Sequence, residues 1–249
     1  MKKMLLLFSF MLLCSMAFGD TVTGLIAHYS MNGTANDFSG NNLTGTLYGT
    51  STTTDRFGNA NSALYFDGND YFATPLYRQN YDYFTVSLWF KYTGSTSDHY
   101  RALVGSNNYG FGAGSQSFFI GKDAGNSNLG VQDQSNYYAN TMAVGTNAWN
   151  GAWHNVAYTY SNGTGKLYLD GVAYGTATFS KDGGQILLGL EPEVSGYYFL
   201  GSMDEVRFYN RALSLSDVVE VYNMVPEPSS LLLGLLGIFS AFIAKKKLL

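Results

Sequence analysis

The chain has 249 residues, and residues 20–224 differ in composition from both ends. This middle part is rich in Gly, Asn, Thr, Ser and aromatic residues and poor in Glu and Lys, which favours strands and turns over helices. Five of the 14 basic and one of the 18 acidic residues lie in the ends, so the middle carries a formal charge of −8. That charge opposes nucleic-acid binding, which needs a cationic surface. The one cysteine, Cys14, lies in the N-terminal segment, which excludes thiol catalysis by the middle.

Residues 1–19 have the parts of a secretory signal peptide. Lys2 and Lys3 precede a mostly apolar run over residues 4–13, and Ala17 and Gly19 place small residues at the −3 and −1 positions. This predicts export and cleavage by signal peptidase before Asp20. The alternatives are a buried helix or a membrane anchor, but the apolar run is too short for a comfortable span.

The middle reads as a succession of strands separated by Gly, Asn, Asp and Ser clusters. Alternating or apolar runs predict strands over 25–31, 63–66, 84–90, 101–104, 117–120, 153–160, 166–169, 172–174, 186–188 and 201–209. Asp170-Gly171 between two of these runs predicts a hairpin turn. Alternation also places Trp89 and Trp153 in the core.

One short helix is predicted after the last strand. Ser214 is the expected N-cap with Asp217 in the first turn, Leu213, Val218, Val221 and Tyr222 form the apolar stripe, and the helix ends before Pro226. The pattern as a whole predicts one all-β domain over residues 20–224, a two-sheet antiparallel β-sandwich with a C-terminal helix.

The last 25 residues, 225–249, form a third part. Val225, Pro226, Glu227 and Pro228 are followed by an uncharged apolar run over residues 231–244 and by three lysines at 245–247. As a helix the run spans about 21 Å, and snorkelling lysines extend its reach towards a ~30 Å hydrocarbon core. The basic end favours a cytoplasmic C-terminus and an external domain.

This order of V-P-E-P, apolar span and basic end resembles the PEP-CTERM sorting signal of Gram-negative bacteria. The resemblance implies processing by an exosortase, transient anchoring in the inner membrane through a transmembrane helix over about 231–244, and delivery to the cell surface or extracellular matrix. A plain tail anchor is the alternative.

Several stretches of the middle resemble the laminin G-like, concanavalin A-like jelly-roll family. They are G-L-I-A-H-Y-S-M-N-G at 24–33, N-D-F-S-G-N at 36–41, D-R-F-G-N-A at 55–60, F-D-G at 66–68, F-T-V-S-L-W at 84–89, W-H-N-V-A at 153–157, L-Y-L-D-G at 167–171 and G-S-M-D-E-V-R-F-Y-N-R-A-L-S at 201–214. The resemblance covers nearly all of the middle and implies a concanavalin A-like jelly roll. Residues 106–150 match least.

A search for catalytic groups argues against an enzyme. Hydrolases of this architecture need two carboxylates across a cleft, and the E-x-D-x-E spacing that the resemblance would imply is missing from the five glutamates. No G-x-S-x-G elbow, zinc-binding histidine spacing or phosphate loop occurs. His154 is expected to hydrogen-bond backbone, and Arg207 to pair with a carboxylate.

The resemblance also implies a possible calcium ion. By position its ligands would be Asp37 and Asp204, with a carbonyl near Gly68, because calcium takes carboxylate and carbonyl oxygens. The alternative is that Asp37 caps a turn and Asp204 pairs with an arginine.

The family resemblance also implies carbohydrate binding. Sugar rings stack on exposed aromatic side chains, so such side chains are the candidate contacts. The candidates are tyrosines and a phenylalanine in loops, namely Tyr109, Phe111, Tyr137, Tyr138, Tyr197 and Tyr198, although each is equally a candidate for the core or its rim. We therefore expect an exported, non-catalytic module that binds polysaccharide, exopolysaccharide or a surface protein. The alternatives are a structural surface protein without a ligand and a glycan-active hydrolase or lyase.

Overall fold

The structure is a computed structural model that describes residues 22–95, 100–107, 117–122, 128–133, 140–144, 148–179, 183–190 and 197–225. Residues Val22–Asn223 belong to one compact unit. The predicted signal peptide and transmembrane helix lie outside the described residues, as do Pro226, Glu227 and Pro228, whereas Val225 is exposed at the end of the described part. Within that part, no helix is long and apolar enough to cross a membrane.

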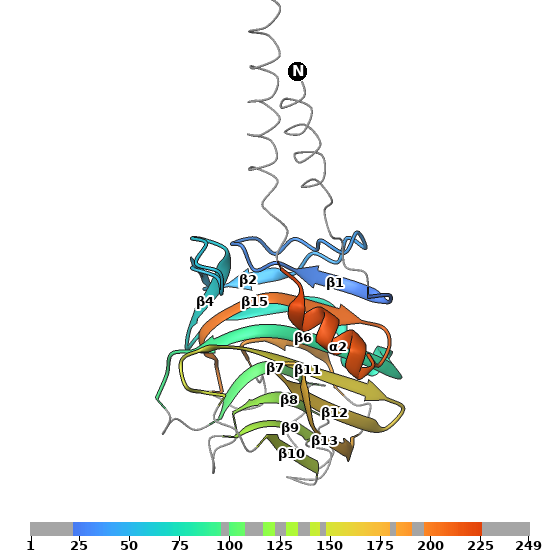
Figure 1. The fold of residues 1–249 in the computed structure, drawn as a ribbon. Coiled ribbons are helices and arrows are strands. Elements are labelled where there is room, and N and C mark those ends of the chain that lie inside the picture. Colours follow the sequence, from blue (N-terminus) through green and yellow to red (C-terminus); the bar gives the residue numbers. More distant parts are fainter. Residues whose placement is uncertain are drawn as a thin grey trace, which may run out of the picture. The chain divides into compact units, whose positions relative to one another are not determined.

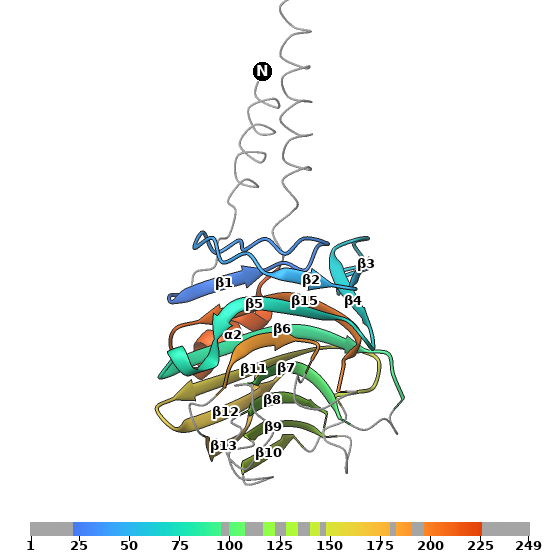
Figure 2. The ribbon, with the colours of Figure 1, turned by 180° about the vertical axis from the view of Figure 1, so that it is seen from behind.

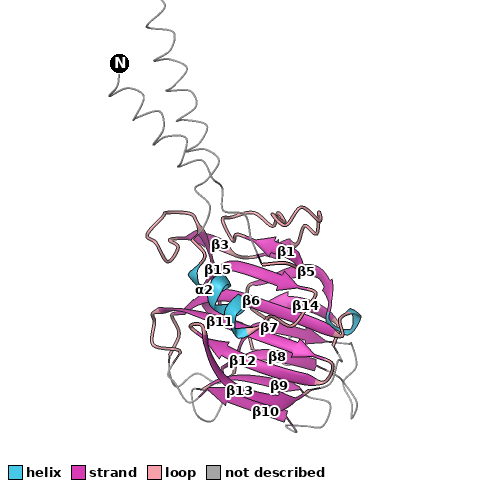
Figure 3. Cartoon of the chain, turned by 45° about the vertical axis from the view of Figure 1, so that its right-hand side comes forward, coloured by secondary structure: helices cyan, strands magenta, loops and turns pink. Residues whose placement is uncertain are grey.

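The described residues form two antiparallel sheets that pack as a sandwich (Figures 1 and 3). Sheet A has the order β13-β12-β11-β6-β15-β4-β3, with β1 also paired to β15. Its strands are β1 (Leu25–Tyr29), β3 (Ser51–Thr53), β4 (Ala63–Asp67), β6 (Tyr83–Tyr92), β11 (Trp153–Ser161), β12 (Thr164–Leu169), β13 (Val172–Thr178) and β15 (Leu200–Tyr209).

Sheet B has the order β10-β9-β8-β7-β14-β5-β2 and can be followed in Figure 2, which shows the molecule from behind. Its strands are β2 (Thr46–Tyr48), β5 (Tyr71–Tyr77), β7 (Arg101–Asn107), β8 (Ser117–Lys122), β9 (Leu129–Asp133), β10 (Asn140–Val144) and β14 (Gln185–Leu188). A 3₁₀ turn, η1 (Arg78–Asn80), follows β5, and helix α2 (Leu215–Asn223) follows β15. The predicted all-β sandwich with one short C-terminal helix is confirmed.

The core lies between the sheets and follows the predicted alternation. In β6, Phe84, Val86, Leu88 and Phe90 point inward and are almost fully buried. Thr85, Ser87 and Trp89, which alternate with them, therefore point to the outer face of sheet A.

Local signals behave largely as expected. Asp170 and Gly171 both adopt positive φ, 50° and 76°, as the predicted hairpin turn requires. Ser214 caps α2 by accepting the Asp217 N–H at 3.2 Å. The prediction for Trp89 was wrong, because it lies on the outer face, and Trp153 is only half-buried. Trp149, in a loop, is the tryptophan of the core.

Candidate functional site

The outer face of sheet A is covered by helix α2 (Figure 1). The Thr85 hydroxyl on β6 donates to the Arg211 carbonyl at 2.7 Å and accepts the Leu213 N–H at 3.0 Å, which holds the segment leading into the helix. Farther along β6, the rings of Trp89 and Tyr222 stack at 5.3 Å. Side chains beneath this cover are therefore closed to a ligand.

A bulge in β15 places two carboxylates side by side on this outer face. The pairing of β15 with β6 shifts register between Asp204 and Arg207, and Glu205 has a φ of 52°. Because Met203 and Val206 both face the core, Asp204 and Glu205 both point outward. The bulge falls where the neighbour of β15 changes from β4, paired with Leu200 to Met203, to β1, paired with Val206 to Tyr209.

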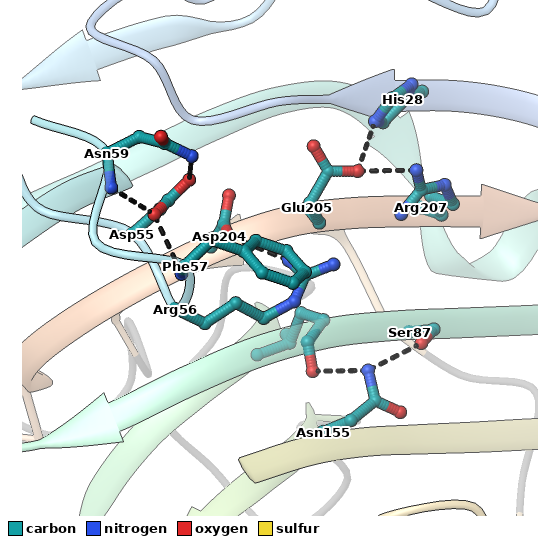
Figure 4. A network of polar contacts seen from close by, with 11 residues as sticks. His28, Asp55, Arg56, Phe57, Asn59, Ser87, Asn155, Asp204, Glu205 and Arg207 are labelled. Carbon is teal, nitrogen blue, oxygen red and sulfur yellow. Dashed lines mark hydrogen bonds and ion pairs between the residues drawn. The ribbon is translucent and has the colours of Figure 1, made fainter. Parts of the chain in front are cut away.

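Basic side chains from three segments neutralise these carboxylates (Figure 4). Arg56 Nη1 lies 2.8 Å from Asp204 Oδ2, and His28 Nε2 lies 3.0 Å from Glu205 Oε2. Arg207 pairs with the same Glu205 oxygen from two residues further along its own strand. All five side chains are buried or nearly so, the most accessible being His28 at 17%. We call this group the β15 charge cluster.

The loop before β4 delivers Arg56 to the cluster. The Asp55 carboxylate accepts the N–H groups of Phe57 and Asn59, both at 2.8 Å, and the Asn59 side-chain amide at 2.8 Å, which fixes the loop (Figure 4). The Arg56 guanidinium then lies 4.5 Å from the ring centroids of both Phe57 and Trp89. The D-R-F-G-N-A stretch is thus a structural motif, a role that the sequence did not reveal.

The two carboxylates of the cluster differ in pKa. Burial and the neighbouring Glu205 raise the pKa of Asp204 to about 7, although Arg56 partly offsets this. Burial alone would also raise the pKa of Glu205, but the hydrogen bond from His28 and the charges of Arg207 and Arg56 bring it down to about 2. Glu205 is therefore the fixed negative charge of the cluster.

The other described histidine with side-chain partners, His154, lies on β11, on the other side of β6 from β15, where it pairs with Phe90. His154 Nδ1 is 2.8 Å from Asp170 Oδ2 and Nε2 is 3.1 Å from Asn150 Oδ1, so the prediction of a backbone partner for His154 was wrong. An open hollow of about 440 Å³ lies beside Asn150, between the end of β6 and residues 149–151. No Asp or Glu is among the described residues that line it.

The residues predicted to hold calcium already have partners. Asp37 accepts the N–H groups of His28, Ser39 and Leu43 within 3.0 Å, and these bonds lower its pKa despite burial. Asp204 faces the Arg56 guanidinium, whose charge would repel a cation. Asp37 thus caps a turn and Asp204 pairs with an arginine, the alternative that the sequence left open.

A calcium ion at these residues would have to displace those partners, so the arrangement does not fit the ion. No group of three or more His, Cys, Asp or Glu suited to a metal occurs among the described residues. Gly68, with a φ of 101°, belongs to the turn between β4 and β5. These contacts argue against the calcium site that the family resemblance implies.

Two of the six aromatic candidates for ligand binding, Tyr197 and Tyr198, lie among the described residues. Tyr109, Phe111, Tyr137 and Tyr138 lie outside the described residues. The described residues on either side of them lie at one end of sheet B. There Asn107 pairs with Ser117, and Asp133 pairs with Phe118 and Asn140.

Tyr197 lies at the other end of β7, where its carbonyl accepts the Ala102 N–H at 3.1 Å. Its ring packs against Tyr100 at 4.7 Å, and Tyr100 covers Phe119 edge-on at 6.2 Å. Tyr197 and Tyr198 are both half-buried. Tyr197 thus completes an aromatic cover over the outer face of sheet B, and its rim position is as consistent with packing as with binding.

A pair of tyrosines that the sequence did not single out is more accessible. Tyr48 on edge strand β2 pairs in register with Tyr71 on β5, and their rings stack 4.2 Å apart at an angle of 10°. Tyr48 is 45% exposed. Leu47 and Phe72 face the core, so both tyrosines belong to the outer face of sheet B.

Polar groups of the β4–β5 turn adjoin this pair. Asp70, next to Tyr71, is buried, and its carboxylate accepts the Asp67 N–H at 2.9 Å. A Cβ on Gly49 would lie 1.9 Å from Asp70 Oδ1, so glycine is required beside Tyr48. With its nitrogen turned to the carboxylates, the Asn69 amide bridges Asp67 and Asp70 at 2.9 and 3.0 Å. Asp67 and Asn69 are exposed in the turn that leads from β4 into Tyr71.

Comparison with known families assigns the fold. The family model described as the concanavalin A-like lectin/glucanases superfamily matches residues 66–219. This chain belongs to that superfamily. The match confirms the family resemblance, whereas the PEP-CTERM resemblance stays a prediction. A search of curated protein sequences returned no match.

Solved structures share the fold at low sequence identity. Domain 4 of AbnA, an extracellular arabinanase of Geobacillus stearothermophilus solved with arabinotriose, is 22% identical with a TM-score of 0.62, over 80% of this chain and 98% of that domain. The binding domain of Paraclostridial Mosquitocidal Protein 1 is 17% identical with a TM-score of 0.60, over 80% of this chain and 52% of that one. A sialidase mutant of Trypanosoma rangeli is 15% identical with a TM-score of 0.63, over 83% of this chain and 35% of the enzyme.

Proposed function

We propose that this chain is an exported, non-catalytic module that binds carbohydrate, with the Tyr48–Tyr71 pair as its contact for a sugar ring. The observation that carries the proposal is the stacked pair on the outer face of sheet B, with Tyr48 exposed and Tyr71 half-buried, next to the polar β4–β5 turn. A sugar packs its C–H face on an aromatic ring while carboxylates and amides take its hydroxyl groups. Asp67 and Asn69, exposed in the turn before Tyr71, would supply such polar atoms.

The relatives support a binding role without defining the ligand. One is an arabinanase domain solved with arabinotriose and another is the binding domain of a toxin. The non-catalytic part of the proposal rests on the β15 charge cluster, where buried carboxylates are paired with basic side chains rather than held across an open groove.

The proposed location follows from the two ends of the sequence. Signal peptidase would remove residues 1–19, and an exosortase would process the chain near Pro226-Glu227-Pro228 while the segment over about 231–244 holds it in the inner membrane. The module would then act at the cell surface or in the extracellular matrix. Changing Glu227 to Ala should leave the protein in the inner-membrane fraction, and unchanged surface delivery would contradict exosortase processing.

Affinity electrophoresis tests the binding role. The full chain, purified in mild detergent, is run through gels containing laminarin, xylan, arabinan, dextran or alginate, and at least one polysaccharide is expected to retard it. Retardation by none would refute carbohydrate binding and leave a structural surface protein. Release of reducing sugar from any of these polymers would refute the non-catalytic role.

A further inference from the structure

The outer side of β5 continues beyond the Tyr48–Tyr71 pair. Burial alternates along the strand, with Phe72, Thr74 and Leu76 inward and Tyr71, Ala73, Pro75 and Tyr77 outward. Tyr77, at the far end, is 43% exposed. Strand β5 thus has the accessible Tyr77 at one end, and at the other end Tyr71, which stacks on Tyr48 of β2.

Small side chains lie between these tyrosines, and polar side chains flank them. Ala73 and Pro75 have small side chains, so neither rises between the rings. In register, Thr46 of β2 pairs with Ala73, and Gln185 of β14 pairs with Tyr77. The Gln185 amide nitrogen donates to the Thr74 carbonyl at 2.7 Å, which fixes this side chain next to Tyr77. A hydroxyl and an amide therefore flank the strip.

The length of the strip suits a chain of sugars rather than a single ring. Tyr77 lies six positions after Tyr71, and at about 3.3 Å per residue the strand covers up to about 20 Å, less the shortening at the irregular pairing where residues 73–77 of β5 face residues 185–187 of β14. That distance is several hexose units. A disaccharide on the Tyr48–Tyr71 pair would not reach Tyr77, whereas a longer oligosaccharide would.

The charges along the strip favour a neutral ligand. Asp67 and Asp70 lie at the tyrosine-pair end, where burial and the Asp67 charge raise the pKa of Asp70. The nearest basic residue in sequence, Arg78, is fully buried, with its guanidinium over the rings of Phe84 and Tyr160. A uronic-acid polymer would meet these carboxylates and, among the described residues of β2, β5 and β14, no cation.

We propose that β5 is a binding strip for a neutral, extended polysaccharide chain, which contacts the Tyr48–Tyr71 pair at one end and Tyr77 at the other. The proposal rests on the carbohydrate-binding function above and specifies its ligand class and the length of its site. Protein and acidic-polymer ligands are outcomes of the test.

Calorimetric titration of the full chain with matched disaccharides and hexasaccharides from laminarin, xylan and arabinan tests the strip. The hexasaccharide of the polymer that binds is expected to bind at least about tenfold tighter than its disaccharide. Tyr48→Ala should weaken both ligands about tenfold, because each stacks on the pair. Tyr77→Ala should weaken the hexasaccharide by a similar factor and leave the disaccharide unchanged.

Tyr83→Ala and Tyr174→Ala are matched controls. Tyr83 is 51% exposed on β6 and Tyr174 is 40% exposed on β13, so both changes remove an accessible tyrosine from sheet A and should leave binding unchanged. Thermal melts of all four variants separate lost binding from lost folding.

The outcomes distinguish this proposal from the function on which it rests. Binding that none of the strip variants weakens would overturn the strip but keep a carbohydrate module. A hexasaccharide no tighter than its disaccharide would overturn the extended site. Tighter binding of alginate oligosaccharides through the same tyrosines would overturn the neutral ligand. Binding of no saccharide at all would overturn both proposals.

Discussion

The outer faces of the two sheets are built in opposite ways. On sheet A, helix α2 and the loop that carries Arg56 cover the surface, and the β15 charge cluster beside them is at most 17% exposed. On sheet B, the outer side of β5 leaves Tyr48 and Tyr77 at 45% and 43% exposure, with no helix of the described residues over them.

The comparison shows that many polar side chains do not by themselves make a site. In the charged motif D-E-V-R at 204–207, Asp204, Glu205 and Arg207 all form ion pairs. These pairs tie β15 to β1 and to the loop before β4. The less conspicuous tyrosines of sheet B remain accessible to a partner. Substitutions on sheet A should therefore change stability, and those on β5 should change binding.

The largest effect is expected from Asp204→Ala. The change leaves the buried Arg56 guanidinium without its carboxylate, which should lower the free energy of unfolding by about 3–5 kcal/mol. Urea denaturation measures this. The paired change Arg56→Met with Asp204→Leu should lose much less, because no charge is left alone. A loss below about 1 kcal/mol for Asp204→Ala would show that the cluster is not a structural element.

The pH dependence of stability should report both carboxylates. Glu205 has a lowered pKa, so the stability that it contributes is present above pH 4.5 and is lost as the pH falls towards 2. Asp204 has a raised pKa, so stability falls instead as the pH rises from about 4 towards 7.

Stability should therefore be highest near pH 4, with the acid limb amounting to roughly 2–3 kcal/mol. Glu205→Gln should flatten the acid limb and Asp204→Asn the neutral limb of a melting-temperature profile. Identical slopes in wild type and Glu205→Gln would contradict the assignment of the acid limb.

The packing of helix α2 on sheet A can be weakened by a substitution that changes no charged residue. Val218 of α2 is 1% exposed, and Val218→Ala should cost about 2 kcal/mol in the free energy of unfolding. Its neighbour Val219 is 38% exposed, so Val219→Ala is a matched control with an expected change within about 0.5 kcal/mol. Equal effects would mean that α2 does not pack on the sheet as described.

The smallest effects on stability are expected on sheet B. Tyr48→Ala removes a largely exposed ring from an edge strand and should cost less than about 1 kcal/mol, chiefly from the lost stacking on Tyr71. A thermal melt checks this next to the binding titrations. A collapse of folding in Tyr48→Ala would make the pair a structural feature like the β15 charge cluster.

Calcium should have no effect on folding. Because Asp37 and Asp204 already have partners, adding calcium chloride or EDTA should move the melting temperature by less than about 1 °C. A clear rise in the melting temperature with calcium would support the calcium site that the family resemblance implies.

The sequence predicts the parts of this fold that depend on local patterns. Alternation located β6 and β11, and Asp170-Gly171 located a hairpin. Strand β5 was missed, because Pro75 and the short polar segments around it argue against a strand. The missed strand is the one that carries the proposed binding strip.

Contacts between distant segments could not be predicted. Arg56 and Asp204 are 148 positions apart, and the bulge that turns Asp204 and Glu205 to one side has no signal in the D-E-V-R motif. Tyr48 and Tyr71 belong to short strands whose pairing is set by register alone. Exposure is a property of the finished surface, so the loop aromatics could not be ranked against the strand tyrosines.

The pairing of β1 with β15 has a mechanical consequence. The first strand of the domain lies along the last, the Asn210 N–H bonds the Gly24 carbonyl at 2.9 Å, and Arg211 Nε bonds the Thr23 carbonyl at 2.7 Å. A tension applied through a tether beyond Val225 would reach β15 and the hydrogen bonds that join it to β1. A polymer held on β5 would pull on sheet B, so the load between it and the C-terminal end would cross the core between the two sheets.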